Sequence, residues 1–234
     1  MTPRSTLRAV ILDADGTMFD TLPSLSAAAA DVLREAGLLG VPAALLRSAL
    51  NRGLRQFIRR ALVLQPAPVD ADEWLRIEQR FLEHYADHRL IDATPYPGLH
   101  AALSTLKAHG VRLGVCTNRD RTSTQRLLDL ASVASLIDVV IGLGDAPAPK
   151  PAAEPLWFAI ERLGVSAQEA LLVGDSETDC ACACSAGVAF AAHIGGYAAR
   201  PEALIPNVMT FERLDRLVDW VLAQRGEARD PTGA

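Results

Sequence analysis

The chain has 234 residues, 50% of them hydrophobic, and a formal net charge of -5 at pH 7. This balance argues against nucleic acid or an anionic membrane surface as the main partner. No segment approaches the roughly 18 consecutive apolar residues of a membrane-spanning helix, and the early apolar run is too short for a signal peptide. We therefore expect a globular enzyme, either one large domain or a core with an insertion, in the reducing cytoplasm.

The first predicted strand, residues 7–12, runs directly into two acids. Its apolar residues indicate a strand buried on both faces of a parallel sheet. Asp13 and Asp15 follow it, two residues apart and therefore on the same side of an extended chain, and Gly16 then allows a sharp turn. Open α/β sheets bind their ligands at this carboxyl end. Two adjacent carboxylates stay ionised only with a cation or a shared proton nearby.

After a turn at residues 13–20, residues 21–94 carry only helical patterns. Trp74, Ile77, Phe81 and Tyr85 recur at spacings of 3, 4 and 4, which is one face of an amphipathic helix. We expect helices at residues 25–36, from Pro42 onward, at 54–64 and at 73–85. This region is therefore predicted to be an all-helical insertion after the first strand.

Beyond Pro95-Tyr96-Pro97-Gly98 the pattern changes to strands alternating with helices. Strands are expected at residues 111–116, 137–141, 170–173, 188–191 and 206–209, and helices at 99–109, 121–131, 154–163, 177–186 and 211–222. Such alternation predicts an α/β fold with a Rossmann-like three-layer core and a parallel sheet. The predicted division is a core of residues 1–20 and 95–226, the helical insertion 21–94, and a disordered tail 227–234.

Polar side chains collect where other predicted strands end. They are Thr117 and Asn118 after residues 111–116, Asp175 and Asp179 after residues 170–173, and Lys150 in a proline-rich loop. The carboxyl ends of parallel strands lie along one edge of the sheet, so these side chains can meet Asp13 and Asp15. Four carboxylates beside one lysine need a counter-cation when buried. Ligands that are all oxygen favour Mg²⁺ over Zn²⁺, and Mg²⁺ accepts a substrate phosphate.

The cysteines do not follow a zinc-finger spacing. Cys180, Cys182 and Cys184 alternate with alanine, and Cys116 lies elsewhere. On a helix, 180 and 184 share a face and 182 points away, so the three cannot converge on one metal ion. We interpret them as small buried helix residues, with a redox or metal role as the alternative.

Four segments, taken in order, resemble the motifs of the haloacid dehalogenase superfamily of phosphohydrolases. They are Asp13-Ala-Asp15-Gly-Thr17, Thr117-Asn118, Lys150-Pro151 and Gly174-Asp175-Ser-x-x-Asp179. The resemblance covers residues 7 to about 220, and the insertion resembles the small α-helical cap of that superfamily. Asp20-Thr21-Leu22-Pro23, His84-Tyr85 and Tyr96-Pro97-Gly98 look most like phosphoglycolate phosphatases.

The resemblance implies a role for each matched residue. Asp13 would attack phosphorus and become an aspartyl phosphate, and Asp15 would protonate the leaving alcohol and then activate water. Thr117 and the backbone amide of Asn118 would hold phosphate oxygens, and Lys150 would pair with Asp13 and the phosphate.

The same resemblance implies a Mg²⁺ site. Asp13, the backbone carbonyl of Asp15, and Asp175 would hold the ion, and Asp179 would support the metal or Lys150. Arg119 departs from the family pattern, because lysine is frequent at that position.

Arg52, Arg55 and Arg59 share a face of the predicted 54–64 helix region, at spacings of 3 and 4. They either meet a carboxylate of an anionic substrate when the cap closes or form a solvated basic face.

The predicted function is a Mg²⁺-dependent phosphatase for a small phosphorylated metabolite such as phosphoglycolate. The alternatives are a phosphomutase resembling β-phosphoglucomutase, a pyrophosphatase of the same superfamily, and a non-catalytic binding protein on this fold. We expect a monomer or homodimer without nucleic acid or membrane partners.

Overall fold

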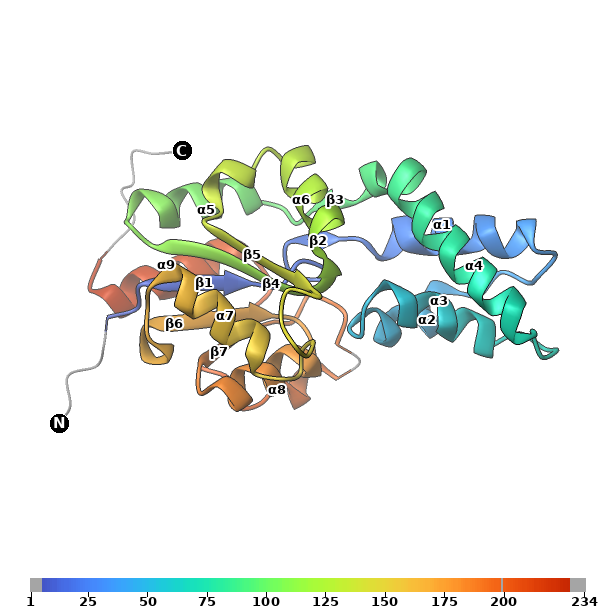
Figure 1. Cartoon of the computed structure of the whole chain (residues 1–234). Coiled ribbons are helices and arrows are strands. Elements are labelled where there is room, and N and C mark those ends of the chain that lie inside the picture. The colour runs from blue at the N-terminus through green and yellow to red at the C-terminus, as the bar shows by residue number, and fades with distance from the viewer. Residues whose placement is uncertain (1–5, 199, 228–234) are drawn as a thin grey trace.

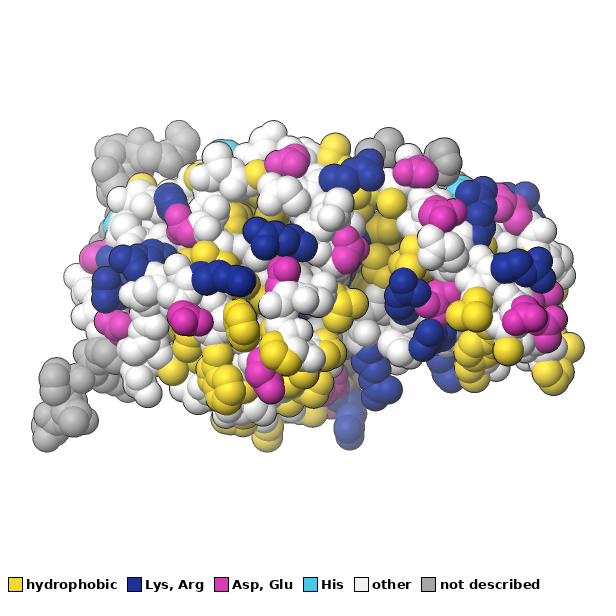
Figure 2. Space-filling view, viewed as in Figure 1, with side chains coloured by type: hydrophobic (Ala, Val, Ile, Leu, Met, Phe, Trp, Pro, Cys, Tyr) yellow, Lys and Arg dark blue, Asp and Glu magenta, His cyan; other side chains and the backbone are white. Residues whose placement is uncertain are grey.

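The computed structural model describes residues 6–198 and 200–227, which form two units side by side (Figure 1). We refer to residues 6–20 and the described residues from 95 onward as the α/β unit, and to residues 21–94 as the helical unit. Acidic and basic side chains are interspersed over the helical unit on the face that Figure 2 shows. Within the described residues, no helix has the length and apolar character needed to cross a membrane.

The α/β unit is built on one parallel sheet of six strands in the order β5-β4-β1-β6-β7-β8. The strands are β1 (Ala9–Leu12), β4 (Arg112–Asp120), β5 (Val139–Leu143), β6 (Ala170–Gly174), β7 (Ala189–His193) and β8 (Met209–Phe211). Leu12, the last residue of β1, pairs with Val115 of β4 and Val173 of β6. The residues after β1 therefore emerge between the ends of β4 and β6.

Helices cover both faces of the sheet and make three layers (Figure 1). They are α5 (Leu99–Ala108), α6 (Arg121–Leu130), α7 (Glu154–Leu163), α8 (Glu177–Ala186) and α9 (Leu214–Arg225). Alternate residues of β1 enter opposite cores: Val10 and Leu12 pack with α5, α6 and α9, whereas Ala9 and Ile11 pack with α7 and α8. The predicted α/β fold with a parallel sheet is thus confirmed.

The helical unit contains four α-helices followed by a short irregular helical segment. They are α1 (Leu22–Glu35), α2 (Ala43–Leu50), α3 (Leu54–Val63) and α4 (Ala71–His84), then a π-helical turn Tyr85–Arg89 and a 3₁₀ turn Leu90–Asp92. Asp70 caps the start of α4: its carboxylate accepts a hydrogen bond from the Glu73 amide. Phe57 and Phe81 stack with ring centroids 6.0 Å apart and join α3 to α4.

Two short strands connect the units, and the sequence pattern missed both. Strand β2 (Phe19–Asp20) lies in a segment predicted as a turn, and it pairs antiparallel with β3 (Thr94–Pro95). Strands of two residues are too short to produce a period-2 pattern, and their pairing partners are far apart in sequence.

Other expected elements shift along the chain, among them two strands. Strand β4 runs to Asp120 rather than Cys116, because its pairing with β5 resumes at Asp120 after a register shift. Thr117 and Asn118 therefore lie within the strand and not beyond it. The last strand, expected at residues 206–209, is Met209–Phe211. Of the predicted tail, residues 228–234 lie outside the described residues.

Candidate active site

The loop after β1 passes close to a second acidic segment. The Asp13 amide donates to the Val173 carbonyl at 2.9 Å and keeps Asp13 in register with β6. Gly16 then adopts a φ of 83°, and a Cβ there would lie 2.3 Å from Asp175 Oδ2. Glycine is therefore required for this turn to approach Asp175.

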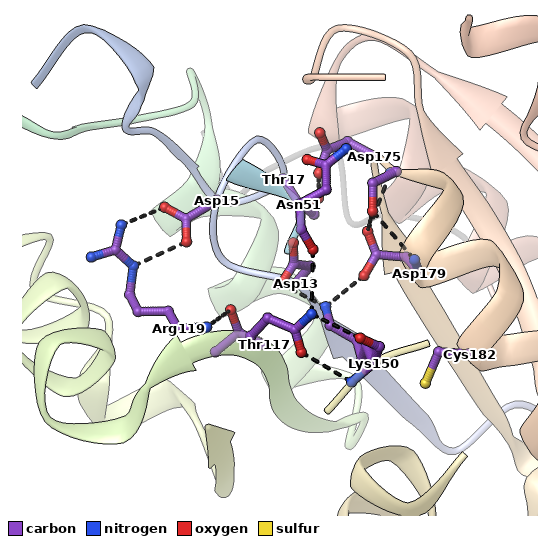
Figure 3. Close-up of polar contacts among 12 residues, drawn as sticks. Asp13, Asp15, Thr17, Asn51, Thr117, Arg119, Lys150, Asp175, Asp179 and Cys182 are labelled. Atoms are coloured by element: carbon purple, nitrogen blue, oxygen red, sulfur yellow. Dashed lines mark hydrogen bonds and ion pairs between the residues drawn. The ribbon is translucent and has the colours of Figure 1, made fainter. Parts of the chain in front are cut away.

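Lys150 joins two of the acids beneath this loop (Figure 3). Its Nζ donates to Asp13 Oδ1 at 2.8 Å and to Asp179 Oδ1 at 2.5 Å, and its side chain is only 2% exposed. Carboxylate oxygens of Asp13, Asp175 and Asp179 lie within 4.8 Å of one another, and all three residues are buried. Three segments that are distant in sequence thus meet at one edge of the sheet.

Neighbouring polar groups fix the orientation of the two later acids. Asp175 accepts from Thr17 Oγ1 at 3.0 Å and from the Tyr197 amide at 2.5 Å. Asp179 Oδ2 accepts from the amide and hydroxyl of Ser176, at 3.2 and 2.5 Å, which forms a capping box at the start of α8. Both oxygens of Asp175, and Oδ2 of Asp179, are therefore held by hydrogen bonds from neighbouring polar groups.

The Asn118 side chain positions the backbone of Lys150 rather than facing outward. Its Oδ1 accepts from the Lys150 amide at 3.0 Å, and its Nδ2 donates to the Lys150 carbonyl at 2.9 Å. Nδ2 also lies 3.3 Å from the carbonyl of Asn51 in the helical unit. Thr117 Oγ1 accepts from the Arg119 amide at 3.2 Å. The pair predicted to hold phosphate thus lies beside Lys150 and near the helical unit.

Burial disfavours the ionised forms of the acids in this cluster. It raises the pKa of Asp13 to about 7, although Lys150 opposes the shift. Burial, together with the charges of Asp179 and Asp13, raises the pKa of Asp175 well above its ordinary value. Burial also opposes the charge of Lys150, but Asp13 and Asp179 raise its pKa overall. One ammonium does not neutralise three buried carboxylates, so the cluster favours a further cation. Oxygen-only ligands in this arrangement fit a hard divalent ion such as Mg²⁺.

Asp15 lies apart from that cluster, although sequence spacing put it on the same side as Asp13. Its carboxylate points away from Asp13 toward Arg119 (Figure 3), which donates to it from Nε at 3.0 Å and from Nη2 at 2.5 Å. Thr21 Oγ1 donates to Asp15 Oδ1 at 2.5 Å. The Asp15 side chain is therefore not part of the acidic cluster, and its predicted contact with the metal, through its backbone carbonyl, stays a prediction.

A narrow cavity opens between these groups and the helical unit. Its lining residues are Asp13, Asp15, Leu50, Asn51, Thr117, Asn118, Arg119, Lys150, Ser176 and Asp179. The centre of a water molecule can occupy only about 10 Å³ of it, which is room for roughly one water. A phosphorylated metabolite is larger than this space, and Leu50 and Asn51 form its wall on the side of the helical unit.

Several site residues were not identified from the sequence. In the sequence, Arg119 stands out only as a departure from a family pattern, although it directly follows Thr117 and Asn118. Ser176 could have been found from the Ser-x-x-Asp spacing of a capping box. Tyr197, Leu50 and Asn51 carry no local signal, because they reach the site only through the tertiary fold.

The three arginines of the α3 region differ in their partners. Arg55 and Arg59 both pair with the buried carboxylate of Glu78 in α4, and Arg59 Nε lies 2.5 Å from Glu78 Oε2. Arg52 lines a separate hollow of about 450 Å³ together with Arg59 and Arg60. Arg55 and Arg59 are thus paired with an acid while their side chains stay 54% and 41% exposed, so the solvated face and the contact with a substrate carboxylate both stay predictions.

The prediction that the cysteines of α8 are buried is confirmed for two of the three. Cys180 and Cys182 are buried, but Cys184 is exposed, so the interpretation as small buried residues is wrong for Cys184. All four thiols are free, and within the described part of the chain no cysteine belongs to the candidate metal cluster.

Comparison with known proteins gives matches over most of the chain. Residues 10–193 match the sequence model of the haloacid dehalogenase-like hydrolases. A phosphoglycolate phosphatase of Rhodospirillum rubrum is 36% identical over 218 residues, covering 92% of this chain and 90% of that protein. One from Cereibacter sphaeroides is 32% identical over 210 residues, covering 90% and 95%. The crystal structure of a predicted phosphoglycolate phosphatase from Haemophilus somnus has a TM-score of 0.85 and 25% identity, covering 90% and 96%.

Proposed function

The chain belongs to the haloacid dehalogenase-like hydrolase family and is a phosphatase, and we propose that it hydrolyses a small phosphorylated metabolite with Mg²⁺ through an aspartyl phosphate. The observation that carries this proposal is the contact of Lys150 with both Asp13 and Asp179 at the end of β1. The lysine makes a buried carboxylate at Asp13 tolerable and places a cation where a transferring phosphoryl group would lie.

Asp13 acts as the nucleophile in this proposal. Its carboxylate attacks phosphorus, the bond to the leaving oxygen breaks, and a covalent acyl phosphate forms. Water then attacks that phosphorus and regenerates the carboxylate with release of inorganic phosphate. Thr117 and the Asn118 amide bind phosphate oxygens, and Lys150 stays paired with the reacting group.

Asp15 moves the protons of both steps. Its protonated carboxyl gives a proton to the leaving alkoxide, and the resulting carboxylate takes one from the attacking water. Asp15 lines the same narrow cavity as Asp13, which supports this role.

The acidic cluster would hold the metal ion. Asp13 and Asp175 are the proposed side-chain ligands, joined by the Asp15 carbonyl, and Asp179 supports Lys150 and the cluster. A Mg²⁺ ion held there would neutralise charge on the phosphoryl oxygens.

Phosphoglycolate is the first substrate to test. Relatives with 32–36% identity over most of their length carry the name phosphoglycolate phosphatase. The helical unit would act as a cap that opens to admit the substrate, because the cavity beneath it has room for about one water. A cytoplasmic setting and a monomeric or homodimeric state stay predictions from the sequence.

A panel of phosphorylated metabolites, assayed for phosphate release with Mg²⁺, tests the proposal. We expect phosphoglycolate to be hydrolysed with a higher kcat/KM than hexose phosphates, and Asp13→Asn to remove turnover of every substrate. Conversion of β-glucose 1-phosphate to glucose 6-phosphate would instead identify a mutase. Absence of turnover on the whole panel and on p-nitrophenyl phosphate would reject a phosphatase role.

A further inference from the structure

The two reactive acids of the proposed mechanism have separate cations. Lys150 contacts Asp13 and Asp179, whereas Arg119 contacts Asp15 with two parallel hydrogen bonds, from Nε at 3.0 Å and from Nη2 at 2.5 Å (Figure 3). Arg119 and Lys150 are the two cationic side chains among the residues that line the cavity. Each of the two acids is therefore paired with its own buried cation.

Arg119 also connects Asp15 to the helical unit. Its side chain is fully buried at the end of β4, and Nη2 lies 3.3 Å from the Tyr85 hydroxyl. The guanidinium carbon lies 5.2 Å from the centroid of the Tyr85 ring, which is within the range of a cation–π contact. Thr21, which the helical unit also supplies, donates to Asp15 Oδ1 directly. The position of Asp15 therefore depends on groups from both units.

Stability alone does not account for Arg119. A buried ion pair is often no more stable than apolar packing of the same volume, because both charges lose their hydration. In addition, Arg119 Nη1 is buried and has no hydrogen-bond partner among the described residues, which is unfavourable. An arginine at such a position is better explained by what it does to Asp15.

We infer that Arg119 is a positioning residue that sets the location of the Asp15 carboxylate. Its contact with Tyr85 links that location to the position of the helical unit. The inference rests on the proposed function, because Asp15 moves protons only in that mechanism. Two parallel hydrogen bonds fix both the place and the plane of the carboxylate, which a single-point cation cannot do. The step most sensitive to Arg119 is the attack of water on the phosphoenzyme, for which Asp15 must hold and deprotonate that water.

Pre-steady-state kinetics with p-nitrophenyl phosphate isolate this step. The p-nitrophenolate group leaves without needing a proton, so formation of the phosphoenzyme is insensitive to Asp15, whereas its hydrolysis is not. General acid–base groups contribute about 10²–10⁴-fold, so we expect Arg119→Met to slow phosphoenzyme hydrolysis by at least about tenfold. The variant then releases a burst of p-nitrophenolate, one per active site, followed by slow turnover. Arg119→Lys recovers part of the loss.

The matched control is Arg112→Met, the same substitution in the same strand. Arg112 lies at the other end of β4 and donates to the Leu163 and Gly164 carbonyls. It should leave both kinetic phases unchanged. Tyr85→Phe removes the phenol that faces Arg119 but keeps the ring, and should slow phosphoenzyme hydrolysis less than Arg119→Met does.

The inference is overturned if folded Arg119→Met hydrolyses the phosphoenzyme at the wild-type rate, or if it slows formation and hydrolysis equally. If that variant does not fold, Arg119→Lys decides: a several-fold slower hydrolysis supports the inference, and a wild-type rate overturns it. A wild-type protein that forms no phosphoenzyme and hydrolyses no phosphate ester rejects the proposed function itself, and the inference with it. The two failures are distinguishable: the first is seen in the Arg119 variants of an active wild-type protein, and the second in the wild-type protein itself.

Discussion

The two units of the molecule each contain a cluster of three charges, with opposite arrangements. In the α/β unit one cation, Lys150, lies between the acids Asp13 and Asp179. In the helical unit one acid, Glu78, lies between the cations Arg55 and Arg59. The Lys150 side chain is 2% exposed, whereas those of Arg55 and Arg59 are 54% and 41% exposed.

The difference shows why one cluster is a candidate active site and the other is not. Water solvates the excess positive charge beside Glu78, so the cluster needs no further partner. The excess negative charge beside Lys150 is shielded from water, and Asp175 adds to it. Only a further cation or bound protons make that arrangement tolerable. Buried charge imbalance, rather than the number of charges, therefore marks the chemistry of this protein.

Removal of the central charge is expected to have its largest effect in the α/β unit. Lys150→Met leaves two buried acids without their cation, so we expect phosphatase activity to fall to background and the free energy of unfolding to fall by about 3 kcal/mol. Urea unfolding and phosphate release measure the two effects. In the helical unit, Glu78→Gln should lower the free energy of unfolding by no more than about 1 kcal/mol, because its partners are half exposed. Equal losses in the two variants would contradict the comparison.

The second largest expected effect is on Mg²⁺ binding in the α/β unit. We expect EDTA to abolish activity and Mg²⁺ to restore it, and Asp175→Asn to raise the Mg²⁺ concentration for half-maximal activity by at least about tenfold. Isothermal titration with Mg²⁺ measures the affinity without relying on turnover. Glu78→Gln is the control and should leave the affinity unchanged. Wild-type affinity in Asp175→Asn would remove this residue from the proposed site.

The two clusters should also differ in the sign of their pH dependence. Burial raises the pKa of Asp13 from 3.8 to about 7, so the folded metal-free protein binds more protons than the unfolded chain in that range. Its stability should therefore fall as the pH rises from about 4 to about 7. Burial alone would raise the pKa of Glu78, but hydrogen bonds and charge from Arg59 and Arg55 lower it overall. That contribution is present above pH 4.5 and is lost as the pH falls below it.

Urea unfolding in EDTA at several pH values measures both slopes. Asp13→Asn should flatten the change between pH 4 and 7, and Glu78→Gln should flatten the loss at lower pH. Added Mg²⁺ should remove most of the Asp13 effect, because the ion favours the ionised carboxylate. A wild-type slope in Asp13→Asn would mean that another group causes it.

The smallest expected effect is at Arg52 in the helical unit. Arg52 lines a hollow separate from the cavity of Asp13, so Arg52→Gln should change kcat/KM for phosphoglycolate by no more than about threefold. Steady-state kinetics measure it, with Arg60→Gln as the control on the same hollow. A tenfold rise in KM for phosphoglycolate, but not for p-nitrophenyl phosphate, would show that Arg52 contacts the substrate carboxylate after the helical unit moves.

The sequence predicts the α/β unit well because its signals are local. Apolar runs that end in polar residues locate the strands, and parallel pairing then brings Asp13, Lys150, Asp175 and Asp179 to one edge. The same reasoning put Asp15 beside Asp13, but its carboxylate turns toward a residue 104 positions away.

Side-chain directions that depend on distant partners could not be read from the sequence. Arg119 and Asp15 meet only after β1 and β4 pair, and Glu78 meets Arg55 only after α3 and α4 pack. The helices of the helical unit follow from apolar spacing, but which basic side chains point toward the site does not. The chemistry of this family member is therefore easier to predict than its substrate.

Identification of the phosphorylated residue tests the central claim most directly. The wild-type protein is mixed with phosphoglycolate and Mg²⁺, quenched during turnover, digested and examined by mass spectrometry. We expect a phosphoryl group on Asp13, cleaved by hydroxylamine as an acyl phosphate is, and none in Asp13→Asn. A phosphoryl group on another residue, or turnover by Asp13→Asn, would contradict the account.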